Sequence, residues 1–183
     1  MQLTFSAEKL DNAQKLLSHI KGAFPKAVSS TLNRVIEGVR TDLVSETKER
    51  YYAKPSDIRK TFKLKKTNKA DLQAVLTSRG LRKNLREYFI TPKSPKKGMK
   101  GIQAAVKRDG VKSISKAFLI RRGGNYKAYL RKGRGRFAVE PITSPSIPQI
   151  LKNPEIVKII EKKAAERFNK RIDHEVARVL GIS

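Results

Sequence analysis

The spacing of hydrophobic residues changes twice along this chain of 183 residues, and this pattern constrains the fold class more than any other feature. Near both ends, apolar residues recur every three or four positions, which is the spacing of an amphipathic helix. Between the ends they recur at every second position, which is typical of a strand with one buried face. The sequence therefore predicts an α+β fold with N-terminal helices, a central antiparallel sheet with a basic face, and a long C-terminal amphipathic helix.

Three long helical segments are expected. The first has a stripe of Leu10, Ala13, Leu17, Ile20 and Phe24, with Ser6 as its N-cap. Pro25 separates it from a second helix, which should end near Tyr51 because Pro55 disfavours helix at the residue before it. The last helix is expected to begin after Asn153 and to stop at Gly181. Its stripe is Val157, Ile160, Ala164, Phe168, Ile172, Val176 and Val179.

The middle of the chain carries the strand pattern. Asp109-Gly110 and Gly123-Gly124-Asn125 are hairpin turn signals. The stretch 91–101, rich in Lys, Pro and Gly, predicts a mobile basic loop between strands. We expect a single α+β domain over 1–183. It would comprise N-terminal helices in 1–53, the basic antiparallel sheet in 54–142, and a Pro-rich turn with the C-terminal helix in 143–183.

Charge is concentrated in the same middle segment. The chain holds 42 Lys and Arg against 16 Asp and Glu, for a net charge of +26. Residues 54–136 alone hold 26 basic and 4 acidic residues, whereas the segments on either side each hold 8 and 6. A charge excess of this size predicts an anionic partner, either nucleic acid or acidic protein surfaces. No Cys is present, which excludes disulfides and thiol catalysis.

Three basic clusters, in residues 59–69, 91–100 and 121–136, contain the predicted binding residues. Nucleic acid and acidic protein surfaces both remain open as their partner. Tyr126 and Tyr129 interleave with the last cluster, so base stacking is conceivable, but alternation places the two rings on opposite faces of a strand and at least one in the core. The predicted residues are Lys63, Lys65, Lys66, Lys96, Lys97, Lys100, Arg121, Arg122, Arg131, Lys132, Arg134 and Arg136.

Catalysis has little support in the sequence. His19 and His174 are the only histidines, and neither lies in a metal-binding spacing. Asp42, Glu46 and Glu49 share one helical face and could hold Mg²⁺ in a nuclease, although a solvated face with ion pairs is the favoured interpretation. We therefore expect no enzyme activity, no cofactor, no metal and no membrane association.

An ordered series of short motifs resembles a known family. Thr31-Leu32-Asn33-Arg34 is followed by Ile58-Arg59, which should open the sheet, and by Lys116-Ala117-Phe118. The Arg/Gly-rich stretch 131–136 and a Pro-rich turn over 141–148 then precede the last helix. This order resembles the minor tail protein Z, or tail completion, family of long-tailed bacteriophages and prophages, over residues 28–175. The motif residues with an expected structural role are Asn33, Arg34, Phe118, Pro145, Ser146 and Pro148. One departure is Ser144, at a position where the family usually has Gly; a positive φ there would strain Ser.

The resemblance implies a structural protein of the virion neck, made in the host cytoplasm. Such a protein caps the head-proximal end of the tail tube and supports head–tail joining. The implied partners are further copies of itself in a ring, expected to have six members, the tail terminator and tail tube proteins, the head–tail connector, and genomic DNA without sequence specificity. The alternative is a free basic nucleic-acid-binding protein.

The size of the charge limits how much of it DNA could meet. A compact domain of this length is about 40 Å high, and duplex of that height carries about 24 phosphates. Six copies of the middle segment, each with a net charge of +22, would far exceed that number. We therefore expect only a minority of the Lys and Arg side chains to face DNA.

Overall fold

The computed structural model describes residues 7–133 and 138–182, and these form two compact units. The first unit comprises the described residues of Met1–Val44, Phe62–Ser78 and Leu151–Ser183. The second comprises those of Ser45–Thr61 and Arg79–Ile150. Each unit is thus built from segments that are distant in sequence, and the single domain expected above stays a prediction. The N-cap expected at Ser6 lies outside the described residues.

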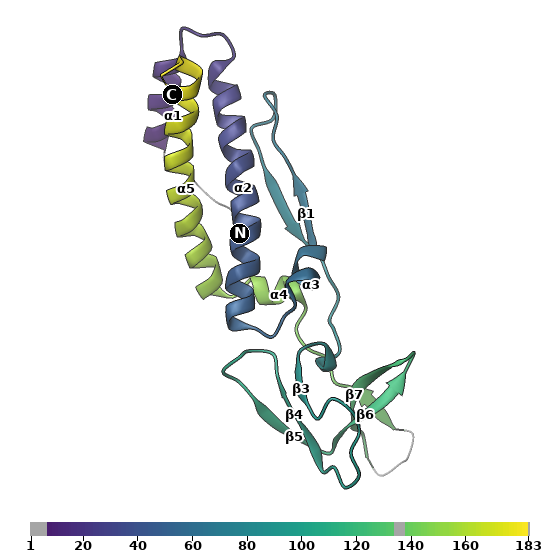
Figure 1. Ribbon diagram of the computed structural model, residues 1–183. Helices are drawn as coiled ribbons and strands as arrows, with labels where there is room; N and C mark the ends of the chain where they lie inside the picture. The colour runs from purple at the N-terminus through teal and green to yellow at the C-terminus, as the bar shows by residue number, and fades with distance from the viewer. Residues whose placement is uncertain (1–6, 134–137, 183) are drawn as a thin grey trace. The chain divides into compact units, whose positions relative to one another are not determined.

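The first unit is mainly helical. It contains α1 (Ala7–Leu17), most of α2 (Ala23–Arg50), α5 (Pro154–Leu180) and the two-stranded antiparallel sheet of β1 (Phe62–Lys65) and β2 (Val75–Ser78) (Figure 1). The helix α1 packs against α5, where Lys9 Nζ lies 2.8 Å from Asp173 Oδ2. The buried side chains of α5 are Ile156, Ile160, Ala164, Phe168, Ile172, Glu175 and Val176. The long amphipathic C-terminal helix is therefore confirmed, with Ile156 rather than Val157 at the start of its buried stripe.

Local signals explain the two ends of α5. The side-chain oxygen of Asn153 accepts a hydrogen bond from the Glu155 N–H at 3.0 Å, so Asn153 is the N-cap. Gly181 ends the helix with φ of 72°, a left-handed conformation that glycine adopts without steric cost. Both ends agree with the sequence-based expectation.

The start of α2 was predicted one turn too late. The helix begins at Ala23, so Phe24 belongs to it and not to the first helix. Pro25 lies within the first turn, where its missing N–H removes no helical hydrogen bond. Its C-terminal end at Arg50 agrees with the expected stop near Tyr51.

The second unit consists mainly of strands. Its elements are α3 (Pro55–Lys60), the 3-10 helix η1 (Leu85–Glu87), β3 (Phe89–Thr91), β4 (Gly101–Ala105), β5 (Lys112–Ser115), β6 (Ala117–Arg122), β7 (Asn125–Arg131), β8 (Val139–Pro141) and most of α4 (Ile147–Leu151). The strands form two three-stranded antiparallel sheets, with orders β3-β4-β5 and β6-β7-β8. The shared core of these sheets comprises Leu85, Ile90, Ile102, Ala104, Ala117, Leu119 and Ala128. The α+β class with antiparallel sheets is confirmed, but the strands form three sheets rather than one.

Two segments of the expected sheet are not strands. Ile58 and Arg59 lie in α3, which Pro55 starts at the first helical position after an extended Lys54. Leu72 alternates with Ala74 and Leu76 as in a strand, but it precedes β2, because Asn68 Oδ1 accepts hydrogen bonds from the backbone N–H groups of Ala70 and Asp71 and closes a turn there. Both exceptions arise from local capping or turn chemistry that competes with the period of two.

The expected turns are present. Gly123 and Gly124, with φ of 59° and 80°, join β6 to β7. The Asp109-Gly110 turn lies between β4 and β5. Residues 92–100 form no strand between β3 and β4, and the mobility of this loop stays a prediction. Within the described part of the chain, no helix combines the length and apolar character needed to span a membrane.

Candidate partner-binding surfaces

The predicted basic residues divide between the two units. Three lie on or just after β1 in the first unit and seven in the second, while Arg134 and Arg136 are outside the described residues. All ten described side chains are exposed, namely Lys63, Lys65, Lys66, Lys96, Lys97, Lys100, Arg121, Arg122, Arg131 and Lys132. They therefore remain available to a partner, but as separate groups on different elements.

Some of these cations already have acidic neighbours. Lys65 Nζ lies 3.0 Å from Asp71 Oδ2, and Lys132 Nζ lies 3.1 Å from Glu140 Oε2. Lys66 Nζ lies 2.6 Å from Glu37 Oε1, and this hydrogen bond lowers the pKa of the Glu37 carboxyl. Exposed pairs of this kind are worth little energetically, about 0–1 kcal/mol, so an incoming anion could displace the carboxylate.

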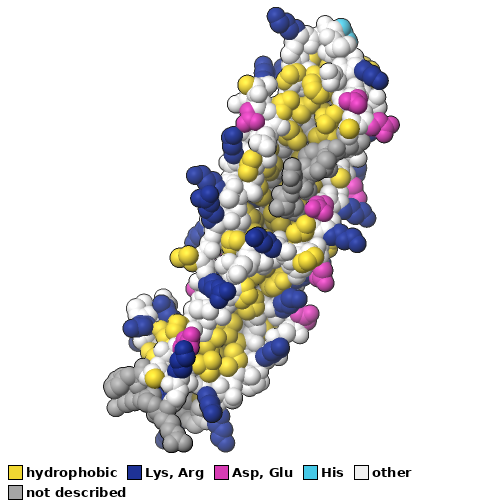
Figure 2. All heavy atoms as spheres, turned by 180° about the vertical axis from the view of Figure 1, so that it is seen from behind, with side chains coloured by type: hydrophobic (Ala, Val, Ile, Leu, Met, Phe, Trp, Pro, Cys, Tyr) yellow, Lys and Arg dark blue, Asp and Glu magenta, His cyan; other side chains and the backbone are white. Residues whose placement is uncertain are grey.

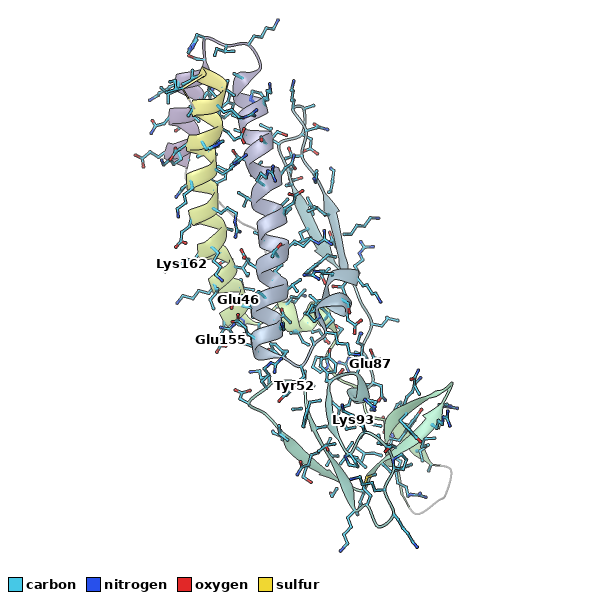
Figure 3. The ribbon with its side chains drawn as sticks, in the orientation of Figure 1. Glu46, Tyr52, Glu87, Lys93, Glu155 and Lys162 are labelled. Atoms are coloured by element: carbon cyan, nitrogen blue, oxygen red, sulfur yellow. The ribbon has the colours of Figure 1, made fainter. Side chains whose placement is uncertain are left out.

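The loop between β3 and β4, residues 92–100, contains lysines and no acidic residue. Its lysines are exposed and include Lys93, labelled in Figure 3, in addition to the three predicted ones.

The net charge differs between the two units. The second unit has 24 Lys and Arg but only 6 Asp and Glu, whereas the first has 18 and 10. The charge excess therefore belongs mainly to the unit of sheets.

The β6–β7 hairpin does not display its tyrosines for base stacking. Tyr126 packs against the core of the second unit, and Tyr129, on the opposite face of β7, is only 5% exposed. The expectation that at least one ring is core is confirmed. On the face that carries Tyr129, the Arg131 guanidinium carbon lies 5.5 Å from the centre of the Phe118 ring, a cation–π contact. Phe118 thus supports a basic side chain of the same hairpin.

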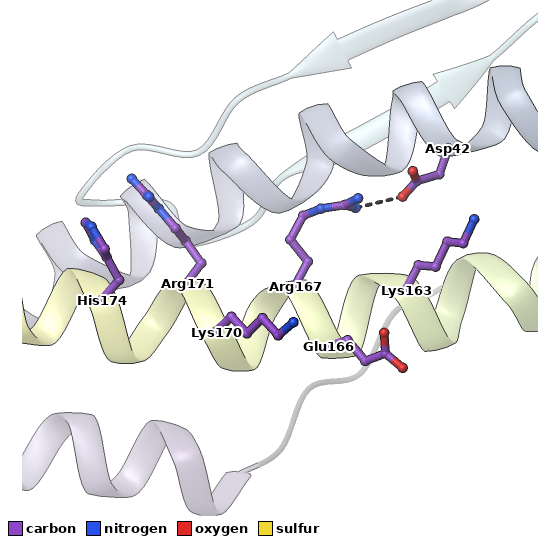
Figure 4. A pocket seen from close by; sticks show the side chains of 7 residues that line it. All are labelled: Asp42, Lys163, Glu166, Arg167, Lys170, Arg171 and His174. Carbon is purple, nitrogen blue, oxygen red and sulfur yellow. Dashed lines mark hydrogen bonds and ion pairs between the residues drawn. The ribbon is translucent and has the colours of Figure 1, made fainter.

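A second basic surface, which the sequence did not indicate, is an open groove of about 550 Å³ between α2 and α5 (Figure 4). Arg167 Nη1 lies 2.7 Å from Asp42 Oδ2 across this groove. A Cβ on Gly38 would collide with the Arg167 guanidinium, so glycine leaves the room in which that group lies against α2. The lining residues are Asp42, Lys163, Glu166, Arg167, Lys170, Arg171 and His174.

The same contacts bear on the nuclease hypothesis. Asp42 is occupied by Arg167, and Glu46 is only 6% exposed, with its Oε2 2.6 Å from Arg50 Nη1. Among the residues that the structure describes, no three metal-binding side chains gather into a possible site. Two of the three carboxylates of that hypothesis, Asp42 and Glu46, therefore take part in ion pairs.

A buried carboxylate of α5, Glu175, pairs with two partly exposed arginines of the same helix and accepts a hydrogen bond from Ser30 of α2. Glu175 is 1% exposed, its Oε1 lies 2.7 Å from Arg171 Nη2, and its Oε2 lies 2.6 Å from Arg178 Nη2. Burial acts to raise the pKa of this carboxyl, but the hydrogen bonds from Arg178 and from Ser30 of α2, with the nearby charge of Arg171, lower it overall. Glu175 is thus held ionised inside the first unit.

Asn33, expected to be structural, binds the backbone of a single residue. Its Oδ1 accepts from the Thr67 N–H at 2.9 Å, and its Nδ2 donates to the Thr67 carbonyl at 3.1 Å. The amide thereby fixes the end of the β1 strand against α2, as a neighbouring strand would. The adjacent Arg34 is exposed.

Replacing Asn33 by alanine should lower the free energy of unfolding by about 1–3 kcal/mol, because the N–H of the buried Thr67 would lose its partner and the Thr67 carbonyl would keep only the Ser29 hydroxyl. Arg34→Ala on the same helix is the control, with an expected change within about 0.5 kcal/mol. Urea denaturation followed by circular dichroism measures both. Equal changes in the two variants would contradict the role assigned to Asn33.

Sequence reasoning missed an equivalent residue in the second unit. Asn84 Oδ1 accepts from the Ala128 N–H at 2.9 Å, and Asn84 Nδ2 donates to the Ala128 carbonyl at 3.1 Å. Because the two residues lie 44 positions apart, no local pattern could reveal the pair.

Side-chain and backbone hydrogen bonds hold the Pro-rich turn in place. Ser144 is not among the described residues with positive φ, so the strain considered for it does not arise, and its N–H and Oγ both donate to the Lys83 carbonyl. The Ser146 N–H donates to Gln149 Oε1 at 2.9 Å, which is capping-box geometry at the start of α4. Pro148 lies in the first turn of that helix, and the exposed Pro145 offers its carbonyl to Tyr88 Oη at 3.1 Å.

Comparison with known protein families identifies the family of this chain. The family model described as "Prophage minor tail protein Z (GPZ)" matches residues 8–182, nearly the whole chain. The chain belongs to the prophage minor tail protein Z family. The resemblance inferred from motif order is thereby confirmed, and it extends beyond the 28–175 first recognised. No curated protein and no solved structure matches the chain. Membership of the minor tail protein Z family supports a structural role in the phage tail, among other tail components.

Proposed function

We propose that this chain is a non-catalytic tail completion protein of the phage neck, which caps the head-proximal end of the tail tube and supports head–tail joining around the DNA channel. The observation that carries the proposal is the family match over residues 8–182. In this proposal the protein works as a ring, with six copies expected, between the tail terminator and tail tube on one side and the head–tail connector on the other. Closed heterologous contacts generate such rings.

The uneven charge of the two units supports a position next to DNA. The second unit, with its excess of 18 cations, is the part suited to anionic surfaces, while the first has a more balanced composition. Non-specific contact with phosphate needs only exposed Lys and Arg, and the loop and hairpin lysines and arginines meet that need. We propose that a minority of them face DNA and that the remainder meet acidic partner proteins.

Deleting the gene from an inducible prophage should leave heads and tails that assemble but do not form infectious joints. The expected result is a fall in plaque titre of several orders of magnitude, with free tails and filled heads visible by negative-stain electron microscopy. A plasmid copy of the gene should restore the titre. Normal joined virions in the deletion strain would contradict the proposal.

The alternative is a free nucleic-acid-binding protein, which the charge of the second unit favours. Such a protein would bind duplex DNA tightly and saturably without associating with tails, and its affinity would fall steeply with salt. Sedimentation of the purified protein with DNA, and separately with purified tails, distinguishes the two functions. Incubation of the same DNA with Mg²⁺ or Mn²⁺ also tests for cleavage, which neither function predicts.

A further inference from the structure

The helices α1 and α5 stop, and α2 starts, at the same end of the first unit (Figure 1). A hollow of about 420 Å³ lies at this end. Four segments contribute to it: the α1–α2 turn, the first turn of α2, the turn between β1 and β2, and the last turn of α5. Gly22 lies in this lining with φ of 73°, and a Cβ there would meet open space. The lining residues are Ile20, Lys21, Gly22, Ala23, Lys26, Lys69, Arg178 and Val179.

Every ionisable side chain among these lining residues is a cation. Arg178 is engaged by the buried Glu175, but Lys21, Lys26 and Lys69 are exposed and take part in no ion pair among the residues that the structure describes. The positive end of the α2 dipole lies at the same end of the unit as the negative ends of the α1 and α5 dipoles, so the excess charge comes from the side chains. The lining of the hollow therefore carries three lysines without an acidic partner in the described part of the chain, although the unit around it has 10 acidic residues.

The same end also exposes large hydrophobic side chains. Leu16 in the last turn of α1 is 54% exposed, Ile20 in the following turn is 37% exposed, and Ile182 after α5 is 77% exposed. Figure 2 shows hydrophobic side chains on the upper end of the visible face, with both basic and acidic side chains around them. Of these three side chains only Ile20 lines the hollow, while Leu16 and Ile182 belong to the segments that end beside it, α1 and the residues after α5. Isolated exposed residues need no explanation, but three large ones at one end of the unit favour a protein contact.

We propose that this helical end surface, defined by Leu16, Ile20, Ile182, Lys21, Lys26 and Lys69, docks an acidic segment of another tail component that carries a large apolar side chain. The inference rests on the proposed tail function. Opposite charge would orient the segment, and burial of its apolar side chain against Leu16 and Ile20 would hold it. Nucleic acid would satisfy the lysines but would leave the apolar residues without a partner. A second copy placing the same surface opposite would bring like charges together.

Full-length protein and tails purified from a phage that lacks this gene provide the test. The lysine variant is Lys21→Glu, Lys26→Glu and Lys69→Glu. All three side chains are exposed, and Lys26→Glu places an acid in the first turn of α2, which suits the helix dipole, so folding should be preserved. The matched control is Lys152→Glu, Lys158→Glu and Lys162→Glu, three exposed lysines of the same unit, of which Lys162 projects away from α2 (Figure 3). Both triple variants change the net charge equally. The apolar variant is Leu16→Ala with Ile182→Ala.

Wild type and control should bind the tails with dissociation constants within about twofold of each other. The lysine variant and the apolar variant should each bind about tenfold more weakly, with unchanged circular dichroism spectra. Equal weakening in both triple variants, or in neither, overturns the inference while leaving the tail function intact. If wild type itself fails to bind tails, the proposed function falls as well.

Two further measurements separate the other occupants. If the lysine variant loses self-association in sedimentation velocity, the occupant is a second copy and the inference is overturned. If it loses only affinity for duplex DNA and still binds tails like wild type, the occupant is nucleic acid and the inference is again overturned.

Discussion

Replacing Phe168 by alanine should lower the free energy of unfolding by about 3–5 kcal/mol, which is the range for deletion of a buried aromatic side chain. Phe168 is 1% exposed on α5 and is the largest fully buried side chain among the described residues. The loss combines the transfer free energy of the ring with the cavity that it leaves. Urea denaturation followed by helical circular dichroism measures the change.

The matched control for this prediction is Ile182→Ala, which removes a large apolar side chain that is 77% exposed. Its free energy of unfolding should stay within about 0.5 kcal/mol of wild type. If Phe168→Ala were as stable as that control, the packing of α5 described above would be wrong.

Replacing Glu175 by glutamine should lower the free energy of unfolding at neutral pH by about 2–3 kcal/mol. Breaking a fully buried ion pair costs about 3–5 kcal/mol. The smaller figure applies because Arg171 and Arg178 are 32% and 46% exposed and regain water when the carboxylate is lost. Replacement of the exposed Asp173 on the same helix by asparagine is the control and should have a small effect.

The same residue makes stability depend on pH. Because the pKa of Glu175 in the folded protein lies below its ordinary value of 4.5, the unfolded chain takes up its proton first as pH falls. The contribution of Glu175 is therefore fully present above the unfolded pKa and is lost as pH falls through the folded pKa. We expect the difference in stability between wild type and Glu175→Gln to shrink when unfolding is measured from pH 6 down to pH 3. A constant difference across that range would contradict the assignment.

The C-terminal helix shows what a single sequence predicts well. Its N-cap, its terminal glycine and its buried stripe all depend on residues within a few positions of one another, so the pattern is readable without tertiary information. The antiparallel strands and their glycine turns were readable for the same reason.

Features that depend on distant residues were not readable. Asn84 binds the backbone of Ala128, and Arg167 forms an ion pair with Asp42, 125 positions away. No local sequence pattern predicts either contact. The division of strands among three sheets likewise depends on which strands meet in space. The predicted lysines are exposed, as charged side chains usually are, and this could be predicted from the sequence. The helical end surface could not be predicted, because its hollow forms only where four separate segments of the chain meet.

The contact of Gly38 with Arg167 has an evolutionary consequence. A side chain at position 38 would occupy the volume taken by the guanidinium, so that the end of the Arg167 side chain would have to shift relative to Asp42. Positions 38, 42 and 167 should therefore vary together among related tail proteins. Where a larger residue replaces this glycine, we expect a shorter side chain in place of the arginine and an uncharged residue in place of the aspartate.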